Sequence, residues 1–133
     1  MKRILIIDDE ETILLSLSHL LRSDSVSVTA CGSVEEAAEA LSRDNFDLVI
    51  ADIRLSGVYG IEGVQMLEYI KDTSPGTSVI VMTAYGSSEM KDVVFEKGAF
   101  HYFEKPIDVS DLLDKIAACG IPVPAAKGKR KCA

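Results

Sequence analysis

Short runs of apolar residues alternate along the chain with segments whose apolar residues recur at helical spacing. Most of the runs are continuous, which is typical of strands buried on both faces of a sheet, whereas residues 26–30 alternate. These runs predict five strands, at residues 4–7, 26–30, 48–51, 78–83 and 100–103.

A helical pattern follows each of these runs. Residues 12–21 place Ile13, Leu14, Leu17, Leu20 and Leu21 on one face of a helix. The second helix follows Ser33, which forms a capping box with Glu36.

The remaining helices also carry start or stop signals. Val64, Leu67 and Ile70 mark the third helix, and Gly98 is placed to end the fourth, at 87–97. Asp108 can cap the fifth helix. Its predicted buried stripe is Val109, Leu112, Leu113, Ile116 and Ala117.

Strict alternation of strands and helices predicts an α/β fold with a parallel sheet covered by helices on both faces. Five βα units are too few for an eight-fold barrel, so we expect an open, doubly wound, flavodoxin-like sheet with strand order 2-1-3-4-5. The pattern predicts one domain at residues 1–120. Residues 121–133, with two prolines and a basic run, are expected to be a flexible tail or linker.

Composition narrows the class of protein. The chain is 47% hydrophobic but only 6% aromatic, so the core must be mostly aliphatic. A net charge of −7 argues against direct binding to nucleic acid. We expect a cytoplasmic protein without a membrane segment or signal peptide, and with Cys31, Cys119 and Cys132 reduced.

Polar residues follow the ends of four predicted strands: Asp8 with Asp9, then Asp52, Thr83 and Lys105. Any one of them has an ordinary explanation, such as Asp8 or Asp9 capping the first helix. Ligands of open parallel sheets bind at the carboxyl ends of the strands, so we expect these side chains to converge.

Crowded carboxylates repel one another, and a divalent cation removes that cost. Ligation by oxygen alone suits Mg²⁺, which also keeps positions open for phosphate oxygens. Lys105 adds a cation for phosphate and Thr83 a hydroxyl donor, while an Asp carboxylate can itself be phosphorylated. The pattern predicts a site that binds a phosphoryl group beside a carboxylate.

Four segments together resemble one known family, the receiver domains of two-component response regulators, over about residues 2–119. They are Ile4 to Glu10, Asp47 to Leu55, Val81 to Gly86 and Gly98 to Pro106. The sequences around Asp52 and Tyr85 resemble those of the receivers of enhancer-binding transcriptional activators.

The resemblance implies a role for each matched residue. Asp52 would accept the phosphoryl group. Asp9 and Asp52 would bind Mg²⁺ directly, Asp8 would help through water, and the backbone carbonyl of Arg54 would complete the protein ligands. Lys105 would pair with the phosphoryl group.

The switch is implied in the same way. Thr83 would donate its hydroxyl to the phosphoryl group, together with the backbone N–H groups of Arg54 and Ala84. Tyr102 would turn inward when Thr83 moves. The bond before Pro106 would be cis, aiming the lysine at the site.

The family's partners are a sensor histidine kinase or a phosphotransfer protein, which supplies the phosphoryl group in a phosphorelay. The implied output is an effector domain or a self-dimer, contacted through the face of helix four, strand five and helix five. The domain is expected to be a signalling phosphoprotein rather than an enzyme, with its own self-phosphorylation and self-dephosphorylation chemistry. Arg54 and Tyr85 occupy positions that tune the loss of phosphate in the family.

The chain departs from the family pattern after Asp52. Ser56 stands where many members have proline, and the stretch from Ser56 to Gly63 is longer than usual before the third helix. Glu62-Gly63 stands where Asp-Gly is usual. This loop borders the site, so its length and sequence affect how long the phosphorylated state lasts, and the family pattern does not predict that lifetime here.

Three alternatives stay open. Asp8 to Thr12 nearly matches the nucleophile loop of haloacid-dehalogenase-like phosphatases, with Asp8 as nucleophile, although the chain lacks room for a substrate cap. A flavin-binding module would share the fold, but the acidic residues after the first strand would repel its phosphate. A pseudo-receiver would bind partners without phosphorylation. His19 and His101 have no paired nucleophile and are not expected to be catalytic.

Overall fold

The computed structural model describes residues 1–52, 61–84 and 88–123, and in these ranges strands and helices alternate strictly. The strands are β1 (Lys2–Ile7), β2 (Val26–Cys31), β3 (Leu48–Asp52), β4 (Ser78–Thr83) and β5 (His101–Glu104). The helices are α1 (Glu11–Leu21), α2 (Val34–Arg43), α3 (Ile61–Thr73), α4 (Ser88–Glu96) and α5 (Val109–Ala118).

The strands form one parallel sheet in the order β2-β1-β3-β4-β5, which confirms the predicted topology. β1 lies between β2 and β3, so the order reverses there, and ligands of such sheets bind beside that reversal. The registers align the carboxyl ends of the central strands: Ile7 lies beside Ala51, and Asp52 beside Met82.

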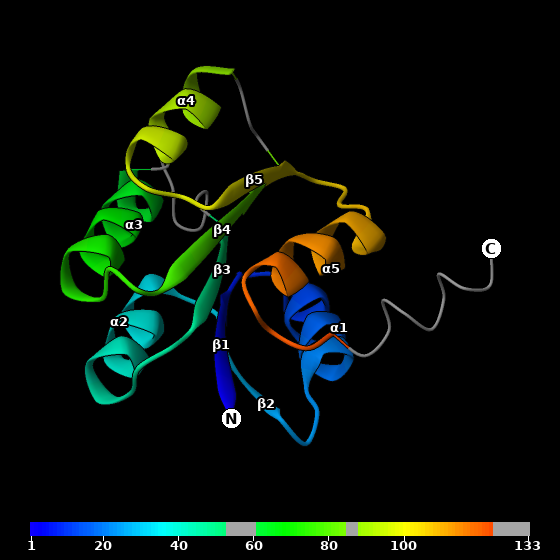
Figure 1. Ribbon diagram of the computed structural model, residues 1–133. Helices are drawn as coiled ribbons and strands as arrows, with labels where there is room; N and C mark the ends of the chain where they lie inside the picture. The colour runs from blue at the N-terminus through cyan, green and yellow to red at the C-terminus, as the bar shows by residue number, and fades with distance from the viewer. Residues whose placement is uncertain (53–60, 85–87, 124–133) are drawn as a thin grey trace.

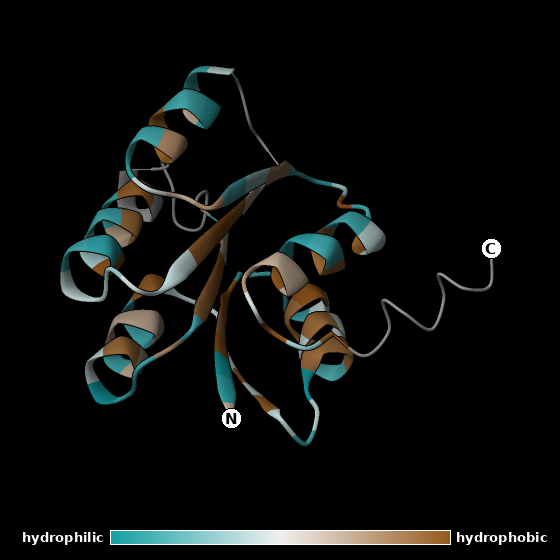
Figure 2. Cartoon of the chain, viewed as in Figure 1, coloured by the Kyte–Doolittle hydropathy of each residue, from teal (hydrophilic) through white to brown (hydrophobic). Residues whose placement is uncertain are grey.

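Helices cover both faces of the sheet, with α1 and α5 on one side and α2, α3 and α4 on the other (Figure 1). Figure 2 shows brown, apolar residues along the central strands and on the inward sides of the helices. In the described part of the chain, the core therefore consists of two mostly aliphatic clusters, separated by the sheet. Strands buried on both faces explain why their sequences are continuous apolar runs.

Local signals that set the helix ends act largely as predicted. The Ser33 side chain accepts a hydrogen bond from the Glu36 N–H, while the Glu36 carboxylate accepts one from the Gly32 N–H at 2.7 Å. The Asp108 carboxylate accepts hydrogen bonds from two N–H groups of the first turn of α5. Gly98 follows α4 with a φ of 105°, a conformation that glycine adopts without strain.

The structure corrects two predicted helix details. The buried stripe of α5 is narrower than predicted, because Val109 and Ala117 are exposed while Leu112, Leu113 and Ile116 are buried. Helix α3 begins at Ile61, so Glu62 and Gly63 belong to the helix and not to the loop before it. Residues 53–60 of that loop lie outside the described residues.

The packed body also extends beyond residue 120, where the tail was expected to begin. Ile121 and Val123 are only 2% and 9% exposed, and both pack into the cluster beneath α1 and α5. Their burial places the end of the packed segment at or after Val123. The remaining residues of the expected tail lie outside the described residues.

Candidate functional site

The sheet brings the chemically distinctive residues to one edge. Asp8 comes directly after β1 and Asp52 ends β3, and the pairing of Ile7 with Ala51 sets these two carboxylates side by side. Thr83 ends β4 beside Glu104, so Lys105 follows at the same edge. Residues from four separate strands thus meet at the end of the sheet where the sequence predicts a site.

Three carboxylates form a compact group there. Each of Asp8, Asp9 and Asp52 offers an oxygen, and these oxygens lie within 4.8 Å of one another. Asp8 is 0% exposed and Asp52 is 2% exposed, whereas Asp9 is exposed to solvent. Buried carboxylates at this spacing need a positive charge between or beside them.

Lys105 supplies such a charge. Its Nζ lies 2.9 Å from Asp8 Oδ2, 2.9 Å from Glu10 Oε1 and 3.2 Å from Asp52 Oδ2. Burial alone would lower the pKa of Lys105, but its hydrogen bonds to Asp8 and Glu10 and the Asp52 charge outweigh burial and raise the pKa. The lysine is therefore an ammonium cation over the whole physiological range of pH.

Asp8 is held by two hydrogen bonds. Oδ1 accepts from the Glu10 N–H at 2.9 Å, and Oδ2 accepts from Lys105. Burial nevertheless raises the pKa of Asp8 above its ordinary value, and the Asp52 charge adds to this, while Lys105 and the Glu10 N–H oppose it. Asp8 does not cap α1, because the residue before that helix is Glu10, whose side chain makes no cap hydrogen bond.

The donor set fits a hard divalent cation. All three converging groups are carboxylates, two of them are buried, and among the residues that the structure describes the group includes no sulfur or imidazole ligand. Oxygen-only sites of this kind select Mg²⁺ or Ca²⁺ rather than zinc or copper. Burial raises the pKa of Asp8 even with Lys105 beside it, so a cation bound next to Asp8 would favour its ionised form.

The structure also describes the residues that were predicted to form the switch and the bond before Pro106. Thr83 is buried, and its backbone carbonyl accepts from the Lys105 N–H at 2.8 Å, while Ala84 beyond it is exposed. Tyr102 is buried in the cluster under α3 and α4, and its hydroxyl donates to Glu104 at 3.4 Å. The Lys105-Pro106 bond is cis.

The remaining residues named from the sequence are either not described by the structure or lie away from the carboxylate group. Arg54 and Tyr85 lie outside the described residues, so their expected roles stay predictions. His19 lies on α1, and His101 packs edge-on against the rings of Phe95 and Phe103. Neither histidine belongs to the carboxylate group.

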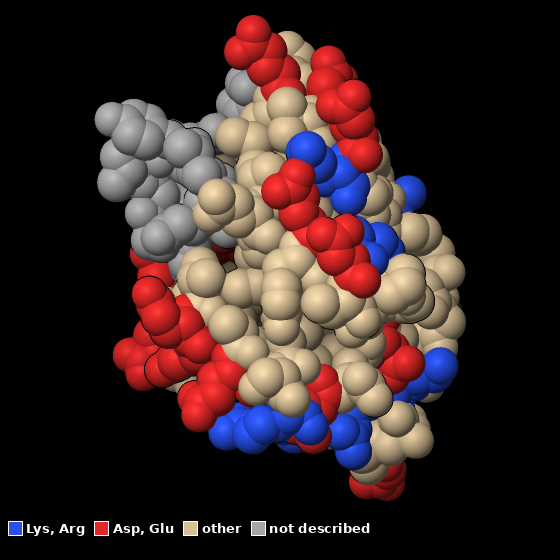
Figure 3. All heavy atoms as spheres, turned by 90° about the vertical axis from the view of Figure 1, so that its left-hand side faces the viewer, with Lys and Arg blue, Asp and Glu red and all other residues tan. Residues whose placement is uncertain are grey.

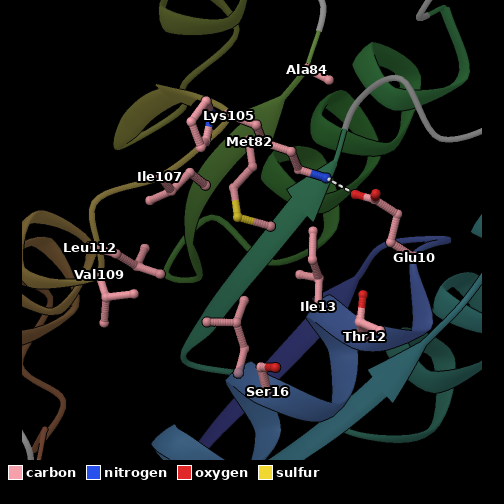
Figure 4. A pocket seen from close by; sticks show the side chains of 12 residues that line it. Glu10, Thr12, Ile13, Ser16, Met82, Ala84, Lys105, Ile107, Val109 and Leu112 are labelled. Carbon is pink, nitrogen blue, oxygen red and sulfur yellow. Dashed lines mark hydrogen bonds and ion pairs between the residues drawn. The ribbon is translucent and has the colours of Figure 1, made fainter.

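Glu10 is the site residue that sequence reasoning missed. It belongs to the acidic run after β1, but nothing in the run indicates which of its members contacts a lysine 95 positions away. Glu10 lies in the turn directly before α1 and Lys105 directly follows β5, and the dashed line in Figure 4 marks the ion pair between them.

A cavity of about 540 Å³ lies beside the Glu10–Lys105 pair, between α1 and α5. The two charged residues stand at one end of it, and apolar side chains line most of the rest (Figure 4). Among them are Ile13, Met82, Ile107, Val109 and Leu112. The ion pair therefore separates the carboxylate group from an apolar groove.

The opposite side of the molecule carries a different surface. Figure 3 looks at the α2, α3 and α4 side, where acidic side chains lie at the top and lower left, basic side chains lie along the lower part, and both kinds lie together in the upper middle among uncharged residues. Cys31 and Cys119 are unpaired thiols. In the described ranges, every helix is too short or too polar to cross a membrane.

Comparison with protein families agrees with the geometry. The profile of the response regulator receiver domain matches residues 4–117. The residues that form the carboxylate group and Lys105 all fall within this match.

Relatives include whole regulators and one short protein. The chain is 35% identical over 116 residues to the response regulator protein PilR of Pseudomonas aeruginosa, covering 87% of this chain and 25% of PilR. It is 28% identical over 115 residues to sporulation initiation phosphotransferase F of Bacillus subtilis, covering 86% of this chain and 90% of that protein. The chain thus spans about a quarter of the length of relatives such as PilR.

Solved structures give the same result. A CheY-like receiver domain protein of Methanospirillum hungatei superposes with a TM-score of 0.81 at 33% identity, covering 89% of this chain and 92% of that one. The beryllofluoride-activated NtrC4 receiver domain dimer gives 0.80 at 32%, covering 90% and 96%. Fold, site and sequence agree, and the chain belongs to the response regulator receiver domain family, the signalling domains of two-component systems.

Proposed function

We propose that this domain accepts a phosphoryl group on Asp52, in a Mg²⁺-dependent reaction, from a histidine kinase or a phosphotransfer protein in the cytoplasm. One observation carries the proposal. The buried Asp52 carboxylate lies within 4.8 Å of the carboxylates of Asp8 and Asp9, and 3.2 Å from the Lys105 ammonium. Family membership supports the same reading.

Asp52 is the nucleophile in this proposal. One of its carboxylate oxygens attacks the phosphorus of a phosphohistidine, so that an O–P bond forms while the P–N bond breaks. The electron pair of the broken bond leaves with the imidazole of the donor. The protein contributes positioning and charge, which dominate phosphoryl transfer.

Lys105 stabilises the transferred group. Because its ammonium already reaches Asp52, a small movement brings it onto a phosphoryl oxygen. Thr83 would add its hydroxyl, and the backbone N–H groups of Arg54 and Ala84 would add theirs.

Mg²⁺ would be held directly by Asp9 and Asp52, through water by Asp8, and by the backbone carbonyl of Arg54. Bound there, the ion supplies the positive charge that neutralises the carboxylates and the phosphoryl oxygens. The converging carboxylate oxygens are the basis for this assignment.

The response to phosphorylation would pass through Thr83 and Tyr102 to the face of α4, β5 and α5. That face would contact an effector domain or a second copy of the chain. In the DNA-binding transcriptional regulator NtrC of Klebsiella pneumoniae, the segment that matches this chain is 22% of the protein. An effector domain attached to this receiver is therefore part of the proposal. Attack of water on the acyl phosphate would end the signal.

The competing phosphatase reading makes Asp8 the nucleophile. To act as a nucleophile, Asp8 would have to give up one of the two hydrogen bonds that its oxygens accept, from the Glu10 N–H and from Lys105. A pseudo-receiver would not need a lysine that bridges both buried carboxylates.

The test is incubation of the protein with acetyl phosphate and Mg²⁺, followed by intact mass measurement. We expect the mass of one added phosphoryl group in the wild type and none in Asp52→Asn or in excess EDTA. Asp47→Asn, which removes a carboxylate before β3, is the matched control and should label normally. Unchanged labelling of Asp52→Asn would refute the assignment.

A further inference from the structure

The Glu10–Lys105 ion pair has a geometry that separates it from the other contacts of the lysine. Glu10 Oε1 lies 2.9 Å from Nζ, as close as Asp8, but the Glu10 side chain is 52% exposed while those of Asp8 and Asp52 are buried. Glu10 is the residue directly before α1, and it lines the apolar groove together with Lys105 (Figure 4).

The ammonium of lysine has three N–H donors and no acceptor. In the structure it makes hydrogen bonds to three carboxylates, those of Asp8, Glu10 and Asp52. Phosphorylation turns the Asp52 carboxylate into an acyl phosphate, so that three phosphoryl oxygens stand where the lysine now has one contact. To donate to more than one of these oxygens, Lys105 must release or weaken its bond to Asp8 or to Glu10.

The three partners differ in what their release costs. Asp8 is fully buried, so loss of the lysine would leave an uncompensated buried charge, which is strongly unfavourable. The Asp52 carboxylate is consumed in the acyl phosphate, so its contact with the lysine passes to a phosphoryl oxygen and leaves Asp8 and Glu10 as the partners that can be released. Glu10 is half exposed and regains water when it is released, and an ion pair of that kind is weak.

We propose that Glu10 is a positioning residue, which holds the Lys105 ammonium in the unphosphorylated state and is the partner exchanged for the phosphoryl group. The inference rests on the proposed function, because it concerns the state of Lys105 before and after Asp52 is phosphorylated. Glu10 thereby opposes phosphorylation: its carboxylate competes with the phosphoryl oxygens for one N–H of the lysine.

Three variants separate the hydrogen bond from the general effect of charge. Glu10→Gln keeps the shape of the side chain and removes its charge. Glu10→Asp keeps the charge but shortens the side chain by one methylene, which draws the carboxylate back from Nζ. Glu11→Gln removes an exposed charge one residue away, on the first turn of α1, and leaves the Glu10–Lys105 contact intact.

The rate of labelling by acetyl phosphate at saturating Mg²⁺ is measured for all three variants and the wild type. Glu10→Gln and Glu10→Asp are expected to label about two- to fivefold faster, the range that loss of a half-exposed ion pair allows. Glu11→Gln is expected to match the wild type.

Each contrary result has one meaning. A Glu10→Gln variant that labels at the wild-type rate or more slowly overturns the inference. So does a Glu10→Asp variant that behaves as the wild type, or a Glu11→Gln variant as fast as Glu10→Gln, because either result indicates charge repulsion without exchange. Absence of labelling in the wild type itself refutes the proposed function, and the inference with it.

Discussion

At the residue scale, the site depends on carboxylates that the fold keeps out of water. Asp8 and Asp52 are both buried, and one lysine is shared between them. Burial raises the pKa of Asp8 despite that lysine, so the ionised group remains poorly compensated. A cation bound beside Asp9 would supply the missing charge.

Replacement of Asp9 by alanine tests this balance. Asp9 is the exposed member of the carboxylate group, so its loss should disturb the packed core little. We expect Mg²⁺ affinity to fall by more than about tenfold, because even the loss of a partner outside the ligand shell costs about 10- to 100-fold. Isothermal titration of metal into both proteins measures it, with Glu11→Ala as the matched control. A wild-type titration curve for Asp9→Ala would exclude Asp9 as a ligand.

The location of a site residue was predictable from the sequence where that residue directly ends or follows a strand. Asp8, Asp52, Thr83 and Lys105 follow buried strands, and a parallel sheet places such residues at one edge without further information. The partner choice of Lys105 was not predictable, because it depends on how the turn before α1 aims Glu10.

At the element scale, the registers of the strands do most of the positioning. The pairing of β1 with β3 and of β4 with β5 sets the two buried carboxylates and the lysine at matching heights. Helix caps were readable from local sequence, since Ser33 and Asp108 act within one turn of themselves. The stripe of α5 was overestimated, because periodicity does not show where the sheet surface ends.

His101 on β5, the strand at the edge of the sheet, should make the unfolding free energy depend on pH. Burial lowers the pKa of His101 below its ordinary 6.5, and the positive charges of Lys115 and Lys91 lower it further, while Asp111 opposes them. The unfolded chain therefore binds this proton more readily than the folded one. The unfolding free energy should fall as the pH drops from 6.5 through the lower, folded-state pKa.

Urea denaturation at about pH 7.5 and about pH 5 measures this effect, since the window lies in the range where histidine titrates. His101→Gln should lose less stability on acidification than the wild type. His19→Gln, at an exposed position on α1, is the matched control. An equal loss in His101→Gln and the wild type would contradict the prediction.

At the scale of the whole molecule, two aliphatic clusters flank one sheet, and the chain closes the second of them with residues beyond α5. Ile121 and Val123 pack there with residues from α1, β1 and α5. The sequence after residue 120 has prolines and basic residues, which favoured a solvated tail. Burial of two separated apolar residues in an irregular segment has no periodicity, so the pattern could not reveal it.

Ile121→Ala tests whether that segment belongs to the folded body. The substitution should lower the unfolding free energy by about 2–4 kcal/mol, as for other buried isoleucines. Leu15→Ala is the matched control, because Leu15 is exposed on α1 and its loss should cost within about 0.5 kcal/mol. Urea unfolding of the three proteins gives both values. Equal stability of Ile121→Ala and the wild type would place Ile121 outside the core.

The most direct test of the central claim is to locate the acyl phosphate. Borohydride reduces an aspartyl phosphate to homoserine, and peptide mass spectrometry after treatment with acetyl phosphate and Mg²⁺ then identifies the modified residue. The account predicts homoserine at position 52 and aspartate at position 8. Homoserine at position 8, or no reduced residue in a protein that has gained a phosphoryl group, would contradict it.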